Sequence, residues 1–496
     1  MGQMDNKFKR SAGILLPVSS LPSKYGIGNF GEEARRWIDF LHAAGQSYWQ
    51  ILPLSPTGYG DSPYQSFSAF AGNSYFIDFE ALYEEGLLDK EVFSNIRWGR
   101  LPDRVDYAAL YEHREQVLRK AFLRFEDHEA LEKFEKQNYW LKHYGLYMVI
   151  KASQEHLPWM KWKKNLRTRH PETIEKILKE NAEDIRYHTF IQYQFDRGWR
   201  ALRAYAKERN VQIIGDIPIY VSLDSADTWA NPGMYQLNEK YLPTEVSGCP
   251  PDSFSADGQV WGNPLYNWED MAKTGHLWWI ERLRKNFDLY DVVRLDHFRG
   301  LESYFAIPYG DKSAARGVWK PGSGTGFIDA IDRAITNAKI IAEDLGYLTD
   351  AVYDLLKYSG YPGMKLIQYA FDDREAGDYT PYRYGENTVV YPGTHDNDTL
   401  KGWSRNAPPS CIKQAMEYTG TRRKKDLPRA MIRLTLQTAS ALAVIPMQDW
   451  LGLDSRARLN TPSTVGGSNW CWRLRPGQIN DSLVEDIAKL TQLYGR

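Results

Sequence analysis

The chain has 496 residues, which exceeds the usual size of one domain but fits an α/β barrel with large insertions. Its 62 Lys and Arg residues nearly balance its 63 Asp and Glu residues, so the net charge is -1. A chain with so small a net charge does not attract polyanions through its overall electrostatic field, so we expect neither nucleic acid nor membrane among its partners.

The cysteines and the N-terminal stretch indicate a reducing compartment. Cys249, Cys411 and Cys471 are scattered and odd in number, which predicts neither a disulfide framework nor a metal site. The apolar run near the N-terminus is short and is broken by Pro17, so it matches neither a signal peptide nor a membrane span. We therefore expect a cytoplasmic protein.

Short apolar, β-prone runs that end in Pro, Gly or polar residues recur along the chain, and most are separated by stretches long enough for a helix. They predict eight strands, which are GILLPV from Gly13, YWQILPL from Tyr48, VQIIGDIPI from Val211, YDVVRLD from Tyr290, KIIAED from Lys339, MKLIQYA from Met364, TVVYPGTHD from Thr388 and LAVIPMQD from Leu442. Continuous apolar strands that alternate with amphipathic segments are typical of a parallel sheet buried on both faces. Eight of them predict an α/β fold of the (β/α)8 TIM barrel type, in one catalytic domain over residues 1–496.

Uneven spacing between the predicted strands indicates two insertions. Residues 75–205, between the second and third strands, have apolar positions that recur at intervals of three and four, which predicts a helical insertion. Residues 218–285, between the third and fourth strands, are rich in Pro, Gly, Asn and aromatic residues. We interpret them as an ordered loop region that carries function.

Four predicted strands end in a carboxylate, namely Asp216, Asp296, Glu343 and Asp396. In a barrel the active site lies where the strands end at their C-terminal face. One such residue is more often a loop cap or an ion-pair partner, but four that converge on one mouth favour a functional site. Strand alternation does not choose between Glu343 and Asp344, which face opposite ways.

Metal binding is the first alternative for this cluster, since His395 and Asp396 could contribute to a ligand shell. Arg294 argues against it. If Arg294 and Asp296 share a strand face, a fixed cation lies beside the candidate ligand and repels a metal ion. The same cation keeps Asp296 ionised at neutral pH.

An ionised carboxylate without a metal suits the nucleophile of a retaining glycosyl transfer. That reaction needs a second carboxyl group about 5 to 5.5 Å away, and neighbouring strands about 4.7 to 4.9 Å apart can supply it. The fourth and fifth strands would place Asp296 beside Glu343, which we predict as nucleophile and acid/base. Like-charge repulsion from carboxylates such as Asp396 would raise the pKa of Glu343.

The motifs RLDHFRG, IIAEDLG and GTHDND, in this order, resemble those of the α-amylase clan of retaining α-glucan enzymes, and GDIPIYV resembles its other strand-end motif. GILLPVSSLPSKYGIGNFG, PLSPTGYGDSPYQSFSAFAGN and PPDSFSADGQVWGNPLYNW are similar to the amylomaltases, or 4-α-glucanotransferases. The resemblance extends to NTPSTVGGSNWCWR, which ends at Arg473. It implies a barrel with inserted subdomains, no separate C-terminal β-domain, no cofactor and no metal.

The resemblance also implies a role for individual residues. Asp296 corresponds to the nucleophile, Glu343 to the acid/base, in preference to Asp344, and Asp396 to a third carboxylate that holds the donor sugar. The implied substrate-binding residues are Arg294, His395, Asp216, Tyr59, Trp261, Asp252, Phe254, Gln259 and Asn460. Asp216 could instead organise Arg294, and Tyr59 and Trp261 could instead belong to the core.

The expected reaction transfers an α-1,4-glucan segment to the 4-hydroxyl of another glucan or of glucose. Maltooligosaccharides, starch or glycogen-type glucans would be the substrates. A hydrolase of the same clan remains open, because both reactions share one covalent intermediate. A non-catalytic glucan-binding barrel and a metal-dependent hydrolase are the alternatives from other classes.

Overall fold

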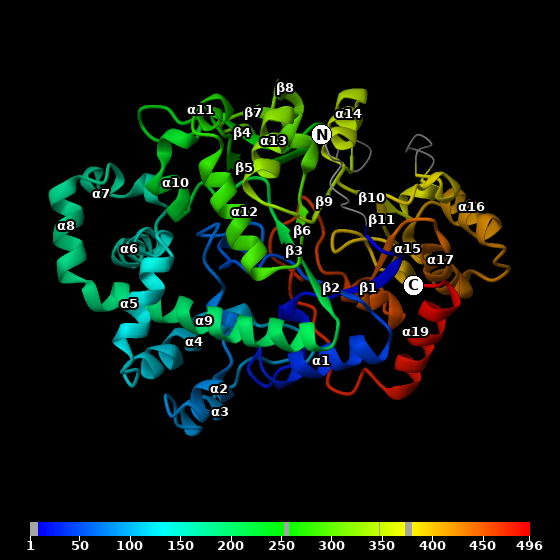
Figure 1. The fold of residues 1–496 in the computed structure, drawn as a ribbon, viewed down its shortest axis with the longest axis horizontal. Helices are drawn as coiled ribbons and strands as arrows, with labels where there is room; N and C mark the ends of the chain where they lie inside the picture. The colour runs from blue at the N-terminus through cyan, green and yellow to red at the C-terminus, as the bar shows by residue number, and fades with distance from the viewer. Residues whose placement is uncertain (1–7, 252–256, 347, 373–378) are drawn as a thin grey trace.

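The computed structural model describes residues 8–251, 257–346, 348–372 and 379–496 (Figure 1). Eight parallel strands close into a barrel, which confirms the predicted fold and places one strand in each predicted run. Around the barrel these are β1 (Ser11–Leu15), β2 (Tyr48–Gln50), β3 (Gln212–Ile217), β6 (Val292–Leu295), β9 (Ile340–Ala342), β10 (Gly363–Leu366), β11 (Thr388–Tyr391) and β12 (Leu442–Pro446). Pairing of β1 with β12, from Ser11 opposite Leu442, closes the ring.

The barrel strands are almost entirely buried because side chains cover both of their faces. Every residue of β1 and of β12 is buried, as expected for continuous apolar strands between a packed interior and a helical layer. Gly13 is required where β1 approaches β2, since a Cβ there would lie 2.7 Å from the Tyr48 Cβ atom.

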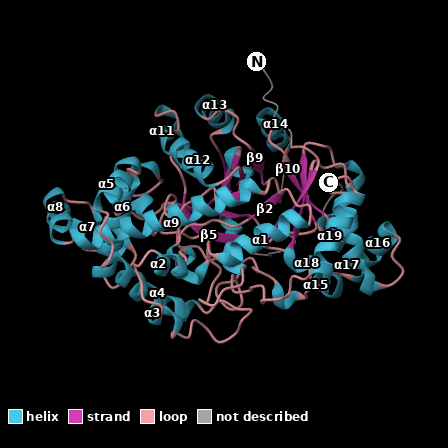
Figure 2. Ribbon diagram, turned by 60° about the horizontal axis from the view of Figure 1, so that its bottom comes forward, coloured by secondary structure: helices cyan, strands magenta, loops and turns pink. Residues whose placement is uncertain are grey.

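A layer of helices surrounds the strands (Figure 2). Its members are α1 (Glu32–Ala43), α9 (Ala182–Glu208), α12 (Leu277–Leu289), α13 (Gly324–Ala334), α14 (Asp350–Ser359), α15 (Leu400–Asn406), α16 (Pro409–Thr419), α17 (Leu427–Gln437), α18 (Met447–Trp450) and α19 (Asp481–Leu493). Among the described residues after β12, the structure contains helices and no further strand.

Helices also occupy the interval predicted to be helical. They are α2 (Phe79–Glu84), α3 (Glu91–Ser94), α4 (Tyr107–Phe122), α5 (His128–Gln137), α6 (Trp140–Ser153), α7 (Lys164–Arg167) and α8 (Pro171–Glu180), followed by α9. Figure 1 shows α5–α8 at one end of the molecule and α16 and α17 at the other. The division of the chain into one domain with two insertions stays a prediction.

A second, four-stranded antiparallel sheet was not expected from the sequence. Its order is β5 (Gln259–Pro264), β4 (Glu245–Cys249), β7 (Ser303–Pro308) and β8 (Val318–Pro321). The interval interpreted as loops therefore contains β4 and β5, together with α10 (Ala226–Ala230), α11 (Trp268–Lys273) and most of α12. The strand signal is weak because glycine interrupts it: a Cβ on Gly248 would lie 2.1 Å from the Gln259 carbonyl oxygen.

No helix within the described ranges is both long and apolar enough to cross a membrane.

Candidate active site

Neighbouring strands bring the predicted catalytic residues to one mouth of the barrel. Asp216 on β3 pairs in register with Arg294 on β6. Asp296 follows β6 directly, and its backbone N–H donates to the Ile217 carbonyl at 3.0 Å. Glu343 follows β9, and its N–H donates to the Leu295 carbonyl at 3.0 Å. The predicted adjacency of these strand ends is therefore confirmed.

Arg294 joins two carboxylates. Its Nη1 donates to both oxygens of Asp216, at 2.8 and 2.7 Å, and to Oδ1 of Asp296 at 2.9 Å. Arg294 and Asp216 are buried, whereas the Asp296 side chain is 28% exposed. Burial lowers the pKa of Arg294, but the charges of Asp216 and Asp296 outweigh it and hold that pKa well above its ordinary value. The guanidinium therefore stays charged beside Asp296.

Glu343 is half-buried and held by backbone donors. Its Oε2 accepts from the His297 N–H at 2.6 Å, and its Oε1 accepts from the Leu345 N–H at 3.2 Å. Burial raises the pKa of Glu343 well above its ordinary range, and Arg294 opposes this shift. Glu343 therefore tends to keep its proton, while the Asp296 carboxylate on the adjacent strand end is paired with the Arg294 cation.

The predicted cause of this shift needs correction. After burial, the charges that raise the pKa of Glu343 are those of Asp296 and Asp344, and Asp396 is not among its main causes. Burial dominates because the backbone around the strand end removes water from the carboxyl group. Like-charge repulsion therefore comes from the neighbouring strand end and from the next residue.

Asp344 faces away from the mouth. Its side chain is buried, and Oδ1 accepts from the Met364 N–H at 2.5 Å on β10. A Cβ on Gly363 would lie 2.6 Å from the same carboxylate, so Asp344 fills the space between β9 and β10. Burial raises the pKa of Asp344 to about 6. This orientation favours Glu343 over Asp344, a choice that strand alternation left open.

Asp396 is linked to two other predicted residues. Its Oδ1 accepts from Asn460 Nδ2 at 2.6 Å and lies 3.4 Å from His395 Nε2. The Asn460 N–H donates to the His395 carbonyl at 3.1 Å. His395 is buried, whereas the Asp396 side chain is 42% exposed. The loops after β11 and β12 therefore hold Asp396 in place with its carboxylate accessible.

Tyr64 is a site residue that the sequence prediction missed. Its hydroxyl donates to Asp216 Oδ2 at 2.7 Å, and its ring stacks on His395 with centroids 5.3 Å apart and planes at 11°. Trp470 packs against both rings, at 5.9 and 6.0 Å. Tyr64 lies in the quoted SPYQSF stretch, but an aromatic residue in a loop has no periodicity that marks it. It connects the Asp216 and Arg294 pair to the Asp396 loop.

Trp261 on β5 lies beside the nucleophile candidate. Its ring meets the His297 ring edge to face at 4.8 Å, and its Nε1 donates to Gln259 Oε1 at 3.1 Å. His297 has a left-handed backbone with φ 52°, which turns its N–H toward Glu343. Its Nε2 is buried without a hydrogen-bond partner in the described part of the chain, and burial lowers its pKa to about 4. The imidazole is therefore neutral near pH 7.

Asp252 and Phe254 lie outside the described residues, and so does the side chain of Tyr59, whose backbone forms a short 3-10 turn over Tyr59–Asp61. Within the ranges that are described, no three His, Cys, Asp or Glu side chains are grouped so as to hold a metal ion.

Comparison with known proteins agrees with this geometry. The family model described as 4-alpha-glucanotransferase matches residues 16–480. A 4-alpha-glucanotransferase of Clostridium butyricum is 44% identical over 484 residues, which cover 97% of this chain and 99% of that protein. The corresponding protein of Thermus thermophilus is 43% identical over 485 residues, which cover 95% of this chain and 96% of its own.

The fold matches a solved structure equally well. An amylomaltase from Streptococcus agalactiae, solved in complex with acarbose, superimposes with a TM-score of 0.96 at 38% identity, over 98% of this chain and 100% of that chain. Matches of this extent show that the chain belongs to the 4-alpha-glucanotransferase family and is an enzyme with that activity.

Proposed function

We propose that the enzyme transfers glucan segments by retaining double displacement, with Asp296 as nucleophile and Glu343 as acid/base. One observation carries this proposal. Arg294 is ion-paired with Asp296, while burial raises the pKa of Glu343 on the next strand end. A carboxylate paired with a cation therefore lies beside a carboxyl group that tends to keep its proton, as the first step needs.

In the first step Glu343 donates its proton to the glycosidic oxygen as the Asp296 carboxylate attacks the anomeric carbon. The bond between that carbon and the glycosidic oxygen breaks, and the fragment beyond it leaves with a free 4-hydroxyl. The donor segment stays bound as an ester of Asp296. The His297 N–H and Leu345 N–H fix Glu343 for this transfer.

In the second step the 4-hydroxyl of an acceptor attacks the same carbon. Ionised Glu343 accepts the hydroxyl proton, the ester bond to Asp296 breaks, and a new α-1,4 linkage forms with net retention. Water attacking in place of the acceptor would give hydrolysis. A glucan held in an acceptor site outcompetes water through its position.

The substrate-binding assignments follow the two sides of this centre. Donor-side contacts come from Asp396, Asn460 and His395, supported by the pair of Arg294 and Asp216, and we add Tyr64 to the predicted Tyr59 because it bonds to Asp216 and stacks on His395. Trp261 and Gln259, with the predicted Asp252 and Phe254, would contact the acceptor. This division rests on the position of Trp261 against His297.

The proposal also covers the sugars that the enzyme uses, its place in the cell and the role of its insertions. Maltooligosaccharides and starch or glycogen-type glucans would be donors, and glucose an acceptor. The odd, scattered cysteines support a cytoplasmic location. Residues 75–205 and 218–285 would be insertions into one catalytic domain and would shape the glucan groove.

Incubation of the purified enzyme with maltotriose tests the reaction. Separation of the products by size should show glucose and a ladder of longer maltooligosaccharides. If maltotriose is only shortened and no longer products form, the enzyme is a hydrolase. If maltotriose is not converted at all, the chain is a non-catalytic glucan-binding barrel. A chelator should leave the rate unchanged, since loss of activity would favour the metal-dependent alternative. Asp296→Asn should abolish turnover while the thermal unfolding transition persists.

A further inference from the structure

A pocket of about 550 Å³ lies in the outer helical layer, where α15, α16 and the turn after α16 meet. None of the predicted site residues that the structure describes lines it. Cavities of roughly 300 to 1,000 Å³ are the size class that holds small-molecule ligands. The glucan reaction therefore does not account for this pocket.

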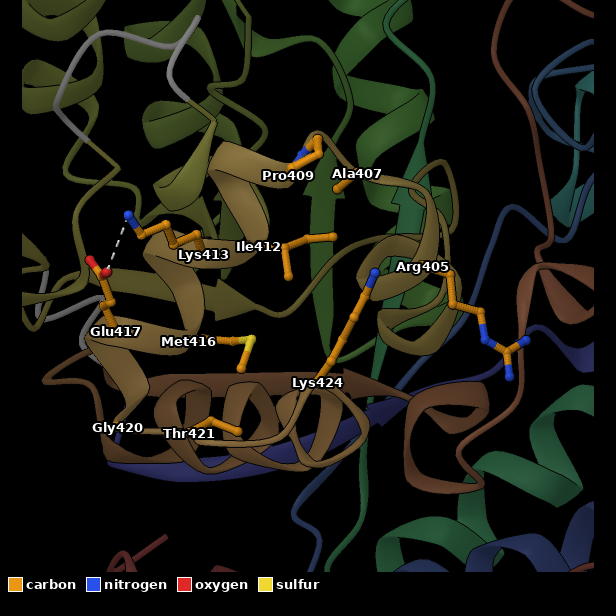
Figure 3. Close-up of a pocket in the computed structure, with 10 residues that line it drawn as sticks. All are labelled: Arg405, Ala407, Pro409, Ile412, Lys413, Met416, Glu417, Gly420, Thr421 and Lys424. Carbon is orange, nitrogen blue, oxygen red and sulfur yellow. Dashed lines mark ion pairs between the residues drawn. The ribbon is translucent and has the colours of Figure 1, made fainter.

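The floor of the pocket is apolar. Ile412 and Met416 are four positions apart on α16, so they project from one face of the helix, and Ala407 and Pro409 extend that surface. Figure 3 shows the Ile412 and Met416 side chains beside one another on the side of α16 toward Lys424. A floor of aliphatic and thioether groups favours a ligand with an apolar or aromatic body. Sugar rings are bound more often through aromatic stacking, and no aromatic residue among those described lines this pocket.

The rim of the pocket is cationic, although the whole chain has a net charge of -1. Arg405, Lys413 and Lys424 line it, and Glu417 is the single carboxylate among the described lining residues. Arg405 lies 3.4 Å from Asp454, and Lys413 lies 3.9 Å from Glu417. An anionic group on the ligand would therefore meet excess positive charge.

Lys424 is the cation best placed for such a group. It forms no ion pair with any carboxylate in the described part of the chain, and Figure 3 shows its side chain extending toward the space between Ile412 and Arg405. The neighbouring Arg423 is engaged by Asp426 at 2.6 Å. A point charge at the end of a flexible stem can reach a carboxylate, sulfonate or phosphate over the apolar floor.

We propose that this pocket binds a small organic anion, with its apolar body on Ile412 and Met416 and its anionic group on Lys424. The site is separate from the barrel mouth, so ligand and glucan bind at the same time. It is also connected to the mouth, because α15 begins at Leu400, four residues after Asp396, and ends at the pocket.

Titration of the full chain with 8-anilinonaphthalene-1-sulfonate, followed by its fluorescence, tests the site. We expect saturable binding at one site per chain that excess maltotriose does not displace. Phenyl phosphate should compete, whereas inorganic phosphate, which lacks the apolar body, should not. Displacement by maltotriose would assign the probe to the barrel mouth and overturn the proposal.

Two variants of lining residues and one matched control identify the binding residues. Lys424→Gln should weaken binding about tenfold or more, as expected for loss of one charged contact, and Met416→Gln should weaken it as well. Lys425→Gln changes an exposed lysine of the same basic run that does not line the pocket, and it should bind like the unmodified chain. Each variant should still convert maltotriose, which shows that it is folded. Equal affinities of the Lys424 and Lys425 variants would contradict the proposed site.

Discussion

One guanidinium nitrogen of Arg294 donates to Asp216 at 2.7 Å and to Asp296 at 2.9 Å, and so fixes one carboxylate inside the barrel and one at its mouth. The Tyr64 hydroxyl donates to the same Asp216 oxygen, Oδ2, at 2.7 Å. The orientation of Asp296 therefore depends on residues from β3, β6 and the loop after β2, none of which has to touch the reacting atoms.

Arg294→Lys should lower kcat by about 10²-fold or more while the chain stays folded. A lysine is a compact charge on a flexible stem and cannot hold two carboxylates in one fixed geometry. Charged hydrogen bonds contribute roughly 1.5 to 3 kcal/mol each, and about 1.4 kcal/mol corresponds to a tenfold change in rate. Initial rates of glucose release from maltotriose measure the effect. A rate within threefold of that of the unmodified enzyme would show that a positive charge at position 294 is sufficient for catalysis, whatever its geometry.

The barrel could be predicted from the sequence because its strands are buried on both faces. A segment such as LAVIP in β12 is apolar throughout, and it differs clearly from the amphipathic helices on either side. The sheet of β4, β5, β7 and β8 gave no such signal. Most residues of β5 and β8 are half-buried or exposed, and Gly248 interrupts β4, so composition indicated loops.

The predicted adjacency of the strand ends is confirmed, whereas the contacts made by loop residues around the mouth were only partly predicted. Asp296 and Glu343 lie on adjacent strand ends because the order of parallel strands follows the chain. Sequence periodicity does not give the distances between side chains around the mouth, so it could not show that Asp296 and Asp344, and not Asp396, are the main carboxylates that raise the pKa of Glu343. Tyr64 was missed for the same reason, since only the folded loop brings it to Asp216.

The fall of kcat/KM on the alkaline side of the pH profile should reflect loss of the Glu343 proton. The first step needs Glu343 protonated, so kcat/KM should fall as the pH rises through its pKa, and burial places that pKa above the range of an ordinary glutamate. With α-maltosyl fluoride, whose leaving group needs no proton, Glu343→Gln should form the ester on Asp296. Mass spectrometry of the digested protein would locate that ester. An unchanged alkaline limb for Glu343→Gln with this donor would assign the limb to another group.

Tyr64→Phe should lower kcat about tenfold and leave KM nearly unchanged. It removes the hydroxyl that donates to Asp216 but keeps the ring on His395, and loss of one bond to a buried charge costs roughly 1 to 3 kcal/mol. Tyr64→Ala removes the ring as well and should lower kcat further. Tyr384→Phe is the control, because that hydroxyl donates to the Tyr379 carbonyl, away from the carboxylates. A similar loss for the Tyr384 and Tyr64 hydroxyls would indicate a general effect on packing.

Asp449 gives the stability of the protein a pH dependence that can be measured directly. It is buried on α18, accepts from the Leu400 N–H at 2.7 Å, and thereby anchors the start of α15 next to the Asp396 loop. Burial raises its pKa from 3.8 to about 7. Because the folded state binds this proton more tightly than the unfolded chain, its stabilising contribution is complete below about pH 4 and is lost as the pH rises toward 7.

Asp449→Asn should therefore gain stability relative to the unmodified enzyme as the pH rises, since the amide keeps an oxygen for the Leu400 N–H and cannot ionise. The difference in the free energy of unfolding between the two proteins should grow between about pH 4 and pH 7 and level off above that range. Urea titrations at several pH values measure it, provided that unfolding is reversible. Asp270→Asn, at an exposed ion pair with Lys273, is the control and should show no such trend. A difference for Asp449→Asn that stays constant from pH 4 to 8 would mean that Asp449 keeps the same charge state in the folded and unfolded chains.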